Sequence, residues 1–247
     1  IALVVLAFLL LGFALSYSRA AWLSLIVALG VYVVIKLRIR FKPLFITFVS
    51  LLVLFFVFQN RIFMMMEQNS EQSSADFSTH ISSMSNITTD ASNLERINRW
   101  SCAIQMFEKK PLFGWGPGTY MFKYAPFQLK ENRTIISTNS ADGGNAHSEY
   151  LGPLAESGLF GMLTYLLIIG VVVYTAVHTY TRLTDKALKS LVLTALISLV
   201  TYYIHGFLNN FLDTDKLSAP FWGFTAIIVT LDIYSRKQLE TAQKNPD

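Results

Sequence analysis

Long apolar stretches are the feature of this sequence that most limits how the chain can fold. A membrane-spanning helix needs about twenty mostly apolar residues, and the sequence offers five such stretches after a truncated one at its beginning. Their bounds are residues 1–15, 20–35, 43–58, 158–177, 188–208 and 217–234. Because an isolated strand cannot satisfy its backbone in lipid, all of them should be helices. The sequence therefore predicts an all-α polytopic membrane protein with about six transmembrane helices.

The composition supports this class. Hydrophobic residues make up 53% of the 247 residues and charged residues only 15%, whereas a soluble domain carries about a quarter charged residues. The single cysteine cannot form an internal disulfide, and no Cys/His cluster has the spacing of metal ligands, so we expect neither a metal nor a cofactor. Since Ile1 lies inside an apolar run without an initiator Met, we expect an N-terminal part to precede this chain.

The basic residues predict which segments share a side of the membrane. Positive charges concentrate in residues 36–42, in residues 182–189 and in the tail after residue 235, and such segments are usually cytoplasmic. Alternation then places residues 16–19, 59–150 and 209–216 on the external side. We divide the chain into three helices over 1–58, a long external loop over 59–150, three helices over 151–234 and a cytoplasmic tail over 235–247.

The second part of the long loop carries the first candidate site residues. Ser92 and Glu95 fit a helix capping box, and Pro111 should end the helix that follows. Its apolar stripe comprises Ile97, Trp100, Ile104 and Phe107. At 100° per residue Arg96 falls on the border of this stripe, whereas Arg99 should point further toward water. Arg96 is thus the better placed to face a site; a surface arginine lying over apolar neighbours is the alternative.

A second candidate site surrounds His147. Asn145 is a good N-cap for a helix toward Ser157, in which Pro153 would introduce a kink and Gly158 a C-terminal cap. In the first turn of that helix the dipole would keep the His147 imidazole neutral and able to accept a proton, and the free amides could bind an anion. A structural histidine is the alternative interpretation.

Other patterns are less specific. Arg19 lies at the external end of the second apolar stretch, where an interfacial anchor is the ordinary explanation. The glycines of residues 114–118 follow no strand, so they predict a tight turn and not a dinucleotide site. No basic patch is interleaved with stacking aromatics, so we expect no nucleic-acid partner.

Three segments together resemble the O-antigen ligase and polymerase superfamily of bacterial membrane glycan transferases. They are Ser18-Arg19-Ala20-Ala21-Trp22; Arg96 and Trp100 followed by Pro111-Leu112-Phe113-Gly114-Trp115-Gly116-Pro117-Gly118; and Ala146-His147-Ser148-Glu149-Tyr150-Leu151 followed by Ala155-Glu156-Ser157-Gly158-Leu159-Phe160-Gly161. The sequence departs from the family pattern at Ser148, where Asn is usual, and at Ala20, where Gly is frequent.

The resemblance implies a GT-C-like fold in the bacterial inner (cytoplasmic) membrane, with the long loop periplasmic. It implies transfer of a glycan from undecaprenyl diphosphate to an acceptor without a metal. Arg19 and Arg96 would contact the diphosphate, because one guanidinium group can bind two phosphate oxygens at once. His147 would be the base for the acceptor hydroxyl. Further substrate contacts are expected from Arg99, Trp100, Asn145 and Glu156.

Several functions remain open at this stage. The acceptor could be lipid A core, another glycan chain or a protein hydroxyl, which correspond to an O-antigen ligase, a polymerase and a protein O-oligosaccharyltransferase. A transporter or flippase with Arg19 and His205 along its route is the alternative of a different class. The gathering of polar residues at one face, beside one long loop, favours an enzyme over a transporter or a structural scaffold.

Overall fold

We analysed a computed structural model, which describes residues 2–16, 18–39, 50, 91–130, 133, 137 and 143–244. All secondary structure in these residues is helical, as the sequence predicts. The elements are α1 (Ala2–Leu15), α2 (Arg19–Lys36), α5 (Ala91–Lys109), α6 (Tyr120–Lys123), the 3₁₀ turn η1 (Ala125–Phe127), α7 (Leu151–Arg182), α8 (Lys186–His205) and α9 (Asp215–Lys244).

Three helices are long and apolar enough to cross a membrane, namely α7, α8 and α9. Helices α1 and α2 are apolar but shorter. These helices agree with five of the predicted apolar stretches. The remaining stretch, residues 43–58, lies outside the described residues, so a total of about six spans stays a prediction.

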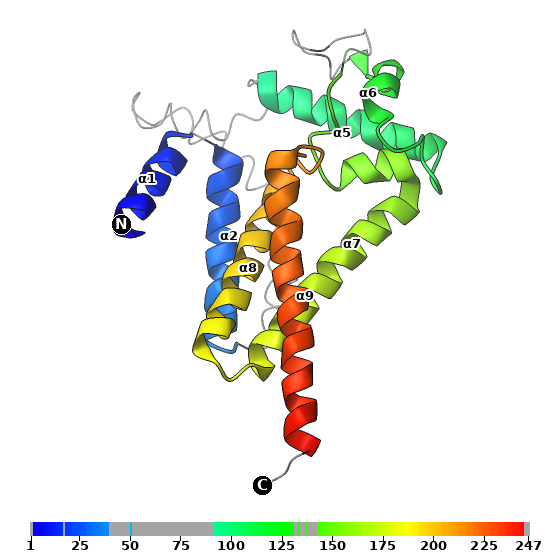
Figure 1. Cartoon of the computed structure of the whole chain (residues 1–247). Coiled ribbons are helices and arrows are strands. Elements are labelled where there is room, and N and C mark those ends of the chain that lie inside the picture. Colours follow the sequence, from blue (N-terminus) through cyan, green and yellow to red (C-terminus); the bar gives the residue numbers. More distant parts are fainter. Residues whose placement is uncertain are drawn as a thin grey trace.

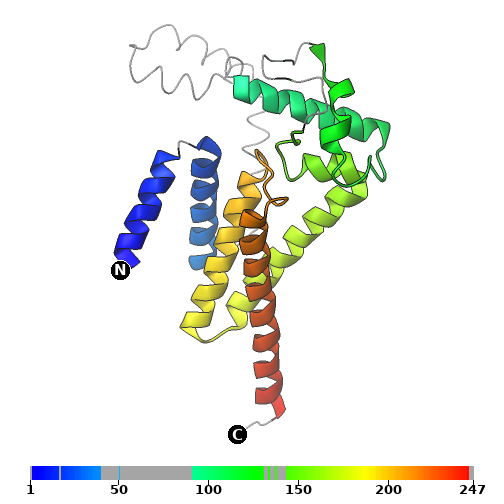
Figure 2. The same ribbon diagram turned by 45° about the horizontal axis from the view of Figure 1, so that its top comes forward.

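The helices form a bundle with α5 lying across one end (Figures 1 and 2). Helix α2 packs along α8, which also contacts α9, and α7 crosses the bundle obliquely (Figure 1). Helices α2, α7 and α9 all begin at the end that carries α5, and α8 finishes there (Figure 1). We call this end the α5 end.

The opposite end carries the basic linker residues and is called the basic end. It is defined by Lys36, Arg182, Lys186 and Lys189, which lie at the ends of α2, α7 and α8. The grouping of segments that the charge pattern predicts is therefore present in the bundle. The assignment of the two ends to the two sides of the membrane stays a prediction.

Two buried clusters hold this arrangement together. The larger lies between α2, α7, α8 and α9 and includes the fully buried Ala28, Ala176, Val192 and Ile228. Alanines at this interface let the helix backbones approach closely, as is common between membrane helices. The smaller cluster joins α5 and α6 to α7 through Met106, and it fixes α5 across the end of the bundle.

Two glycines fix the angle between α7 and the turn after α5. Gly158 has φ 68° and ψ −158° and separates two helical parts of α7. The predicted helix end at Gly158 is therefore present as a kink, whereas the kink predicted at Pro153 is wrong, because the backbone there is helical. A Cβ atom on Gly158 would lie 2.4 Å from the backbone carbon of Leu112, and one on Gly114 would lie 2.4 Å from that of Glu156. Only glycine permits this approach together with a positive φ.

Backbone hydrogen bonds complete the contact between the turn and the kink. The amide of Gly116 donates to the carbonyl of Glu156 (2.7 Å), and the amide of Leu159 donates to the carbonyl of Pro111 (2.8 Å). The glycine-rich turn thus provides partners for a carbonyl and an amide at the kink, which α7 leaves without helical partners. The two motifs are distant in sequence, yet they form one structural unit beside the candidate site.

Candidate functional site

Helix α5 contributes a buried ion pair at the heart of the candidate site. The Nε atom of Arg99 lies 2.7 Å from Oε1 of Glu95, and the two side chains are only 7% and 8% exposed. The expectation that Arg99 points toward water is therefore wrong. Its face of α5 is covered by the segment around α6 and by the loop before α7, which helical periodicity alone does not reveal.

The guanidinium of Arg99 is held on several sides. It lies 3.9 Å from the centre of the Tyr124 ring, a favourable cation–π position, and Tyr120 Oη donates to the Arg99 carbonyl (2.7 Å). Among the described residues Nη1 of Arg99 has no hydrogen-bond partner. Burial opposes the charge, but the hydrogen bond with Glu95 raises the pKa of Arg99 above its ordinary value. The positive charge is thus fixed in place.

A polar network continues from Glu95 on the same face of α5. Ser137 Oγ donates to Oε2 of Glu95 (2.5 Å). The side-chain amide of Asn98 donates to Oε1 of Gln128 (3.0 Å) and to Ser137 Oγ (3.3 Å). Because buried polar groups are costly unless they are hydrogen-bonded, this network determines how the chain after α6 covers α5.

The loop before α7 carries His147 in an unusual backbone conformation with φ 48°. Its amide donates to Oδ1 of Asn145 (3.1 Å), and its carbonyl accepts from Nε1 of Trp100 on α5 (3.4 Å). Asn145 thus forms a local turn and does not cap α7. Ser148 Oγ accepts the amides of Tyr150 and Leu151 (3.3 Å each) at the start of the helix.

His147 therefore precedes α7, and its predicted place in the first helical turn is wrong. Its predicted neutrality has another cause than the helix dipole. Burial, followed by the charges of Arg96 and Arg99, lowers the pKa of the imidazole, and Glu95 opposes this only in part. The ordinary pKa of histidine is about 6.5, so the ring is neutral near pH 7 and able to accept a proton.

The residues after His147 attach the loop to α8 and to the segment before α9. Oε1 of Glu149 accepts the hydroxyl of Tyr202 (2.5 Å) and the amides of Phe211 (2.7 Å) and Leu212 (2.9 Å). The hydroxyl of Tyr150 donates to the carbonyl of Tyr203 (2.8 Å). No role is predicted for Glu149 from the sequence. Its place beside His147 in the third motif was the only sign of its importance.

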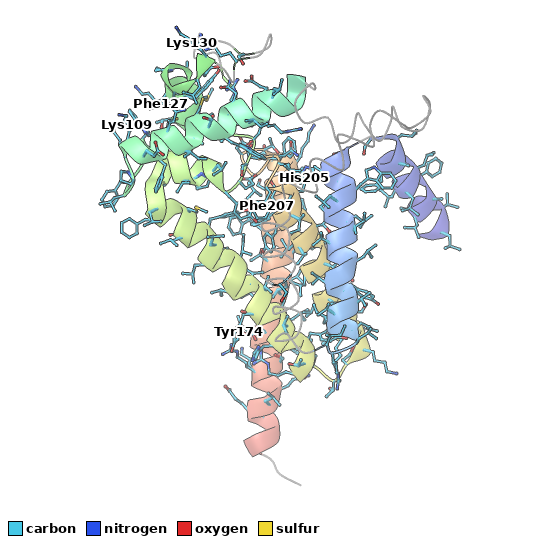
Figure 3. The ribbon with its side chains drawn as sticks, turned by 180° about the vertical axis from the view of Figure 1, so that it is seen from behind. Lys109, Phe127, Lys130, Tyr174, His205 and Phe207 are labelled. Atoms are coloured by element: carbon cyan, nitrogen blue, oxygen red, sulfur yellow. The ribbon has the colours of Figure 1, made fainter. Side chains whose placement is uncertain are left out.

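The start of α2 and the end of α8 meet the same region. Arg19 is the first residue of α2, and Ser18 caps this helix by accepting the Ala21 amide (3.3 Å). The ring of His205 hydrogen-bonds the backbone of Ala20 and lies 3.2 Å from Nδ2 of Asn209. Figure 3 labels His205 at the α5 end of the bundle. The charge of Arg96 acts on both His205 and His147, so the three sequence motifs converge here.

Glu156 supports the glycine-rich turn. Its Oε2 accepts the amide of Gly118 and its Oε1 the amide of Tyr120, both at 2.9 Å. Both oxygens thus hold the start of α6, and this contact gives Glu156 a structural role in addition to the predicted substrate contact. A sequence scan could not pair Glu156 with a turn so far along the chain.

A cavity of about 290 Å³ adjoins the His147 loop. It is lined by Gly118, Tyr120, Met121, Gly144, Asn145, Ala146, Ser148, Glu149, Gly152, Pro153, Glu156, Asn210 and Asp213. This lining contains no Lys, Arg or His among the residues that the structure describes. Among the described residues, Oδ1 of Asn210 is buried without a hydrogen-bond partner. In the same part of the chain, no group of three or more His, Cys, Asp and Glu side chains could hold a metal ion.

Comparison with known proteins identifies the family. The family model of the O-antigen ligases matches residues 4–166, which is more than half of the chain and includes all three motifs. A search of curated proteins and a search of solved structures gave no match. The motifs that converge at the α5 end are thus matched by one family model, and the chain belongs to the O-antigen ligase family.

Proposed function

We propose that this protein is a membrane glycosyltransferase that moves a glycan from undecaprenyl diphosphate to an acceptor hydroxyl at the periplasmic face of the inner membrane. The family supports a membrane enzyme of the ligase or polymerase kind. The observation that carries the proposal is the environment of His147. Trp100, on the helix that carries Arg96 and Arg99, donates to the carbonyl of His147 (3.4 Å). Burial and the charges of the two arginines lower the pKa of the imidazole, so a proton acceptor and positive charge occur together.

In the proposed reaction the acceptor oxygen attacks the anomeric carbon of the donor sugar. His147 takes the hydroxyl proton, and the bond from the anomeric carbon to the diphosphate oxygen breaks. The diphosphate leaves with the electron pair, and direct displacement inverts the anomeric configuration. The leaving group gains negative charge in the transition state, where fixed cations stabilise it most.

We assign this stabilisation to Arg96 and Arg19, whose guanidinium groups suit phosphate oxygens. Arg99 has a different position, because its Nε is bound to Glu95 and its plane lies on Tyr124. We infer that Arg99 supplies fixed positive charge beside His147, and that Trp100 and Asn145 position the loop. With arginines supplying the charge, the proposed reaction needs no metal.

The cavity beside the loop is suited to the sugar units of the glycan. Its amide and carboxylate groups can hydrogen-bond hydroxyls, whereas its lack of basic residues does not favour a diphosphate. The unpartnered Oδ1 of Asn210 supports this assignment. The loop of His147 would then separate a basic region for the diphosphate from a neutral to acidic region for sugar.

Three acceptors are compatible with the proposed reaction, because each offers a hydroxyl group: lipid A core, a second glycan and a protein. A transporter would place polar residues along the bundle. The buried polar side chains described on α2, α7, α8 and α9 instead lie toward the two ends of the bundle: Ser24 toward the α5 end, and Thr179, Asp232 and Ser235 toward the basic end. This arrangement favours an enzyme.

The test uses membranes that contain the full-length protein and lipid-linked glycan from the same cells. Loss of lipid-linked glycan, with its appearance on lipid A core, glycan or protein, supports the proposal and names the acceptor. Movement of intact lipid-linked glycan across the membrane, without a new glycosidic bond, would replace the enzyme with a flippase.

A further inference from the structure

Two adjoining cavities lie at the basic end of the bundle, far from the His147 loop. One has a volume of about 450 Å³ and the other about 710 Å³, and both are lined by Tyr180 and Lys189. The Nζ atom of Lys189 lies 5.7 Å from the centre of the Tyr180 ring, so this pair stands between the two cavities. Neither cavity includes a residue of the three motifs.

The larger cavity has mainly apolar walls on three helices. Val31, Val34 and Ile35 come from α2, Val173 and Val177 from α7, and Leu196 and Val200 from α8. Most of these residues lie between the middle of the bundle and its basic end, and Val200 lies beyond the middle of α8. Arg38 and Lys189 line the same cavity at the basic end. An apolar cavity next to cations is suited to a lipid with an anionic head group and not to a soluble anion.

The smaller cavity is more polar and more basic. It is lined by Lys36, Lys186 and Lys189 together with the hydroxyl residues Ser190, Thr194 and Ser198. Ammonium groups and hydroxyls both donate hydrogen bonds to phosphate oxygens.

No acidic residue of the described ranges lines either cavity. The two nearby described acids are engaged elsewhere: Asp185 accepts the amides of Ala187 and Leu188, and Asp232 is paired with Arg182 and Arg236. Among the described residues, none of Lys36, Arg38, Lys186 and Lys189 forms a salt bridge. Within the described part of the chain, the charge of these four cations outweighs that of Asp185, the acid next to Lys186.

We propose that these cavities bind an anionic glycerophospholipid of the bilayer leaflet at the basic end. The phosphate lies in the smaller cavity near Lys186 and Lys189, and an acyl chain enters the apolar cavity along Val177 and Leu196. Basic pockets between membrane helices recognise anionic lipid head groups in this way. The proposal is independent of the glycosyltransferase reaction, because the site is at the opposite end of α2 and α8 from His147.

The test measures lipid binding by the purified full-length protein. The protein is delipidated in a neutral detergent and titrated with fluorescent phosphatidylglycerol, and separately with phosphatidylcholine carrying the same label. We expect tighter binding of phosphatidylglycerol. The double variant Lys186→Gln/Lys189→Gln should weaken its binding about thirtyfold and leave phosphatidylcholine binding unchanged. Lys123→Gln/Lys130→Gln, which removes the same charge at the α5 end, is the matched control.

Lys186→Arg/Lys189→Arg keeps the charge and should retain the preference, which separates loss of charge from misfolding. Equal binding of the two lipids by the wild type would overturn the proposal, as would an equal effect of the control variant. Tighter binding of labelled undecaprenyl phosphate than of phosphatidylglycerol would overturn the lipid assignment. A wild-type protein that prefers phosphatidylglycerol but transfers no glycan would contradict the proposed function and leave the lipid site standing.

Discussion

Trp100 on α5 donates its indole hydrogen bond to the backbone carbonyl of His147, at 3.4 Å. This bond joins two motifs that are 47 residues apart and supports a loop residue whose φ is positive. A backbone in that region needs support from its surroundings. Trp100 is therefore a positioning residue for the proposed base.

Replacing Trp100 with Phe should lower the rate of glycan transfer several-fold and leave the protein inserted in the membrane. The substitution removes one hydrogen bond, worth about 1 kcal/mol, and keeps an aromatic ring. The measurement is kcat and KM for lipid-linked glycan in membranes. Ile104→Val, at an exposed position on α5, is the control and should behave as wild type. A normal kcat in Trp100→Phe would remove Trp100 from this role.

The pH dependence of transfer should follow His147. Its pKa is lowered, so the neutral base persists below pH 6.5, and activity should fall only as the pH drops through this lowered pKa. Arg96→Gln removes a positive charge that lowers this pKa, so the acid limb should move to higher pH. Arg96→Lys keeps the charge and should leave the limb in place, while losing activity because the guanidinium fork is gone. If the acid limb of the pH profile lies at the same pH in Arg96→Gln and Arg96→Lys, the electrostatic effect of Arg96 on His147 is contradicted.

The contact between Gly114 and Gly158 predicts a sharp difference between glycines of α7. Gly158→Ala places a Cβ atom 2.4 Å from the backbone of Leu112 at a positive φ, and should destabilise the protein by more than about 1 kcal/mol. Gly170→Ala lies in the same helix with nothing within 4 Å and should be neutral or stabilising. Thermal unfolding in detergent compares the two variants. Equal melting temperatures would show that α7 does not require the kink.

Glu149 should be required for folding of the site more than for chemistry. Glu149→Ala leaves the buried hydroxyl of Tyr202 and the part-buried amide of Leu212 without their acceptor, which should cost about 1–3 kcal/mol. Glu149→Gln keeps an acceptor oxygen and should lose less stability. The measurement is thermal unfolding together with transfer activity. Full stability with lost activity in Glu149→Ala would instead place Glu149 in the reaction.

Much of the bundle could be predicted from sequence because the signal is local. The apolar stretches of α7, α8 and α9 and the start of α2 follow directly from hydropathy and capping residues. The same local reasoning predicted the break at Gly158 but wrongly added a kink at Pro153. Pro153 lies early in α7, where proline is tolerated, whereas Gly158 is bent by a contact with a distant turn.

The candidate site was predicted only in part for the same reason. Arg96 and His147 were expected at one site from their motifs, and the charge of Arg96 does act on His147. The burial of Arg99 depends on Glu95 and on Tyr124 beyond the end of α5. The contacts of Glu149 and Glu156 depend on residues more than 30 positions away. Such long-range pairings leave no periodic pattern in a single sequence.

The most direct test of the central claim compares His147→Ala with His178→Ala in membranes of the full-length protein. His178 is an exposed histidine near the basic end of α7, so its replacement controls for the loss of an imidazole. Consumption of undecaprenyl-diphosphate-linked glycan should continue in His178→Ala and stop in His147→Ala, with normal insertion and donor binding in both. Continued transfer by a well-folded His147→Ala would contradict the assignment of His147 as the base.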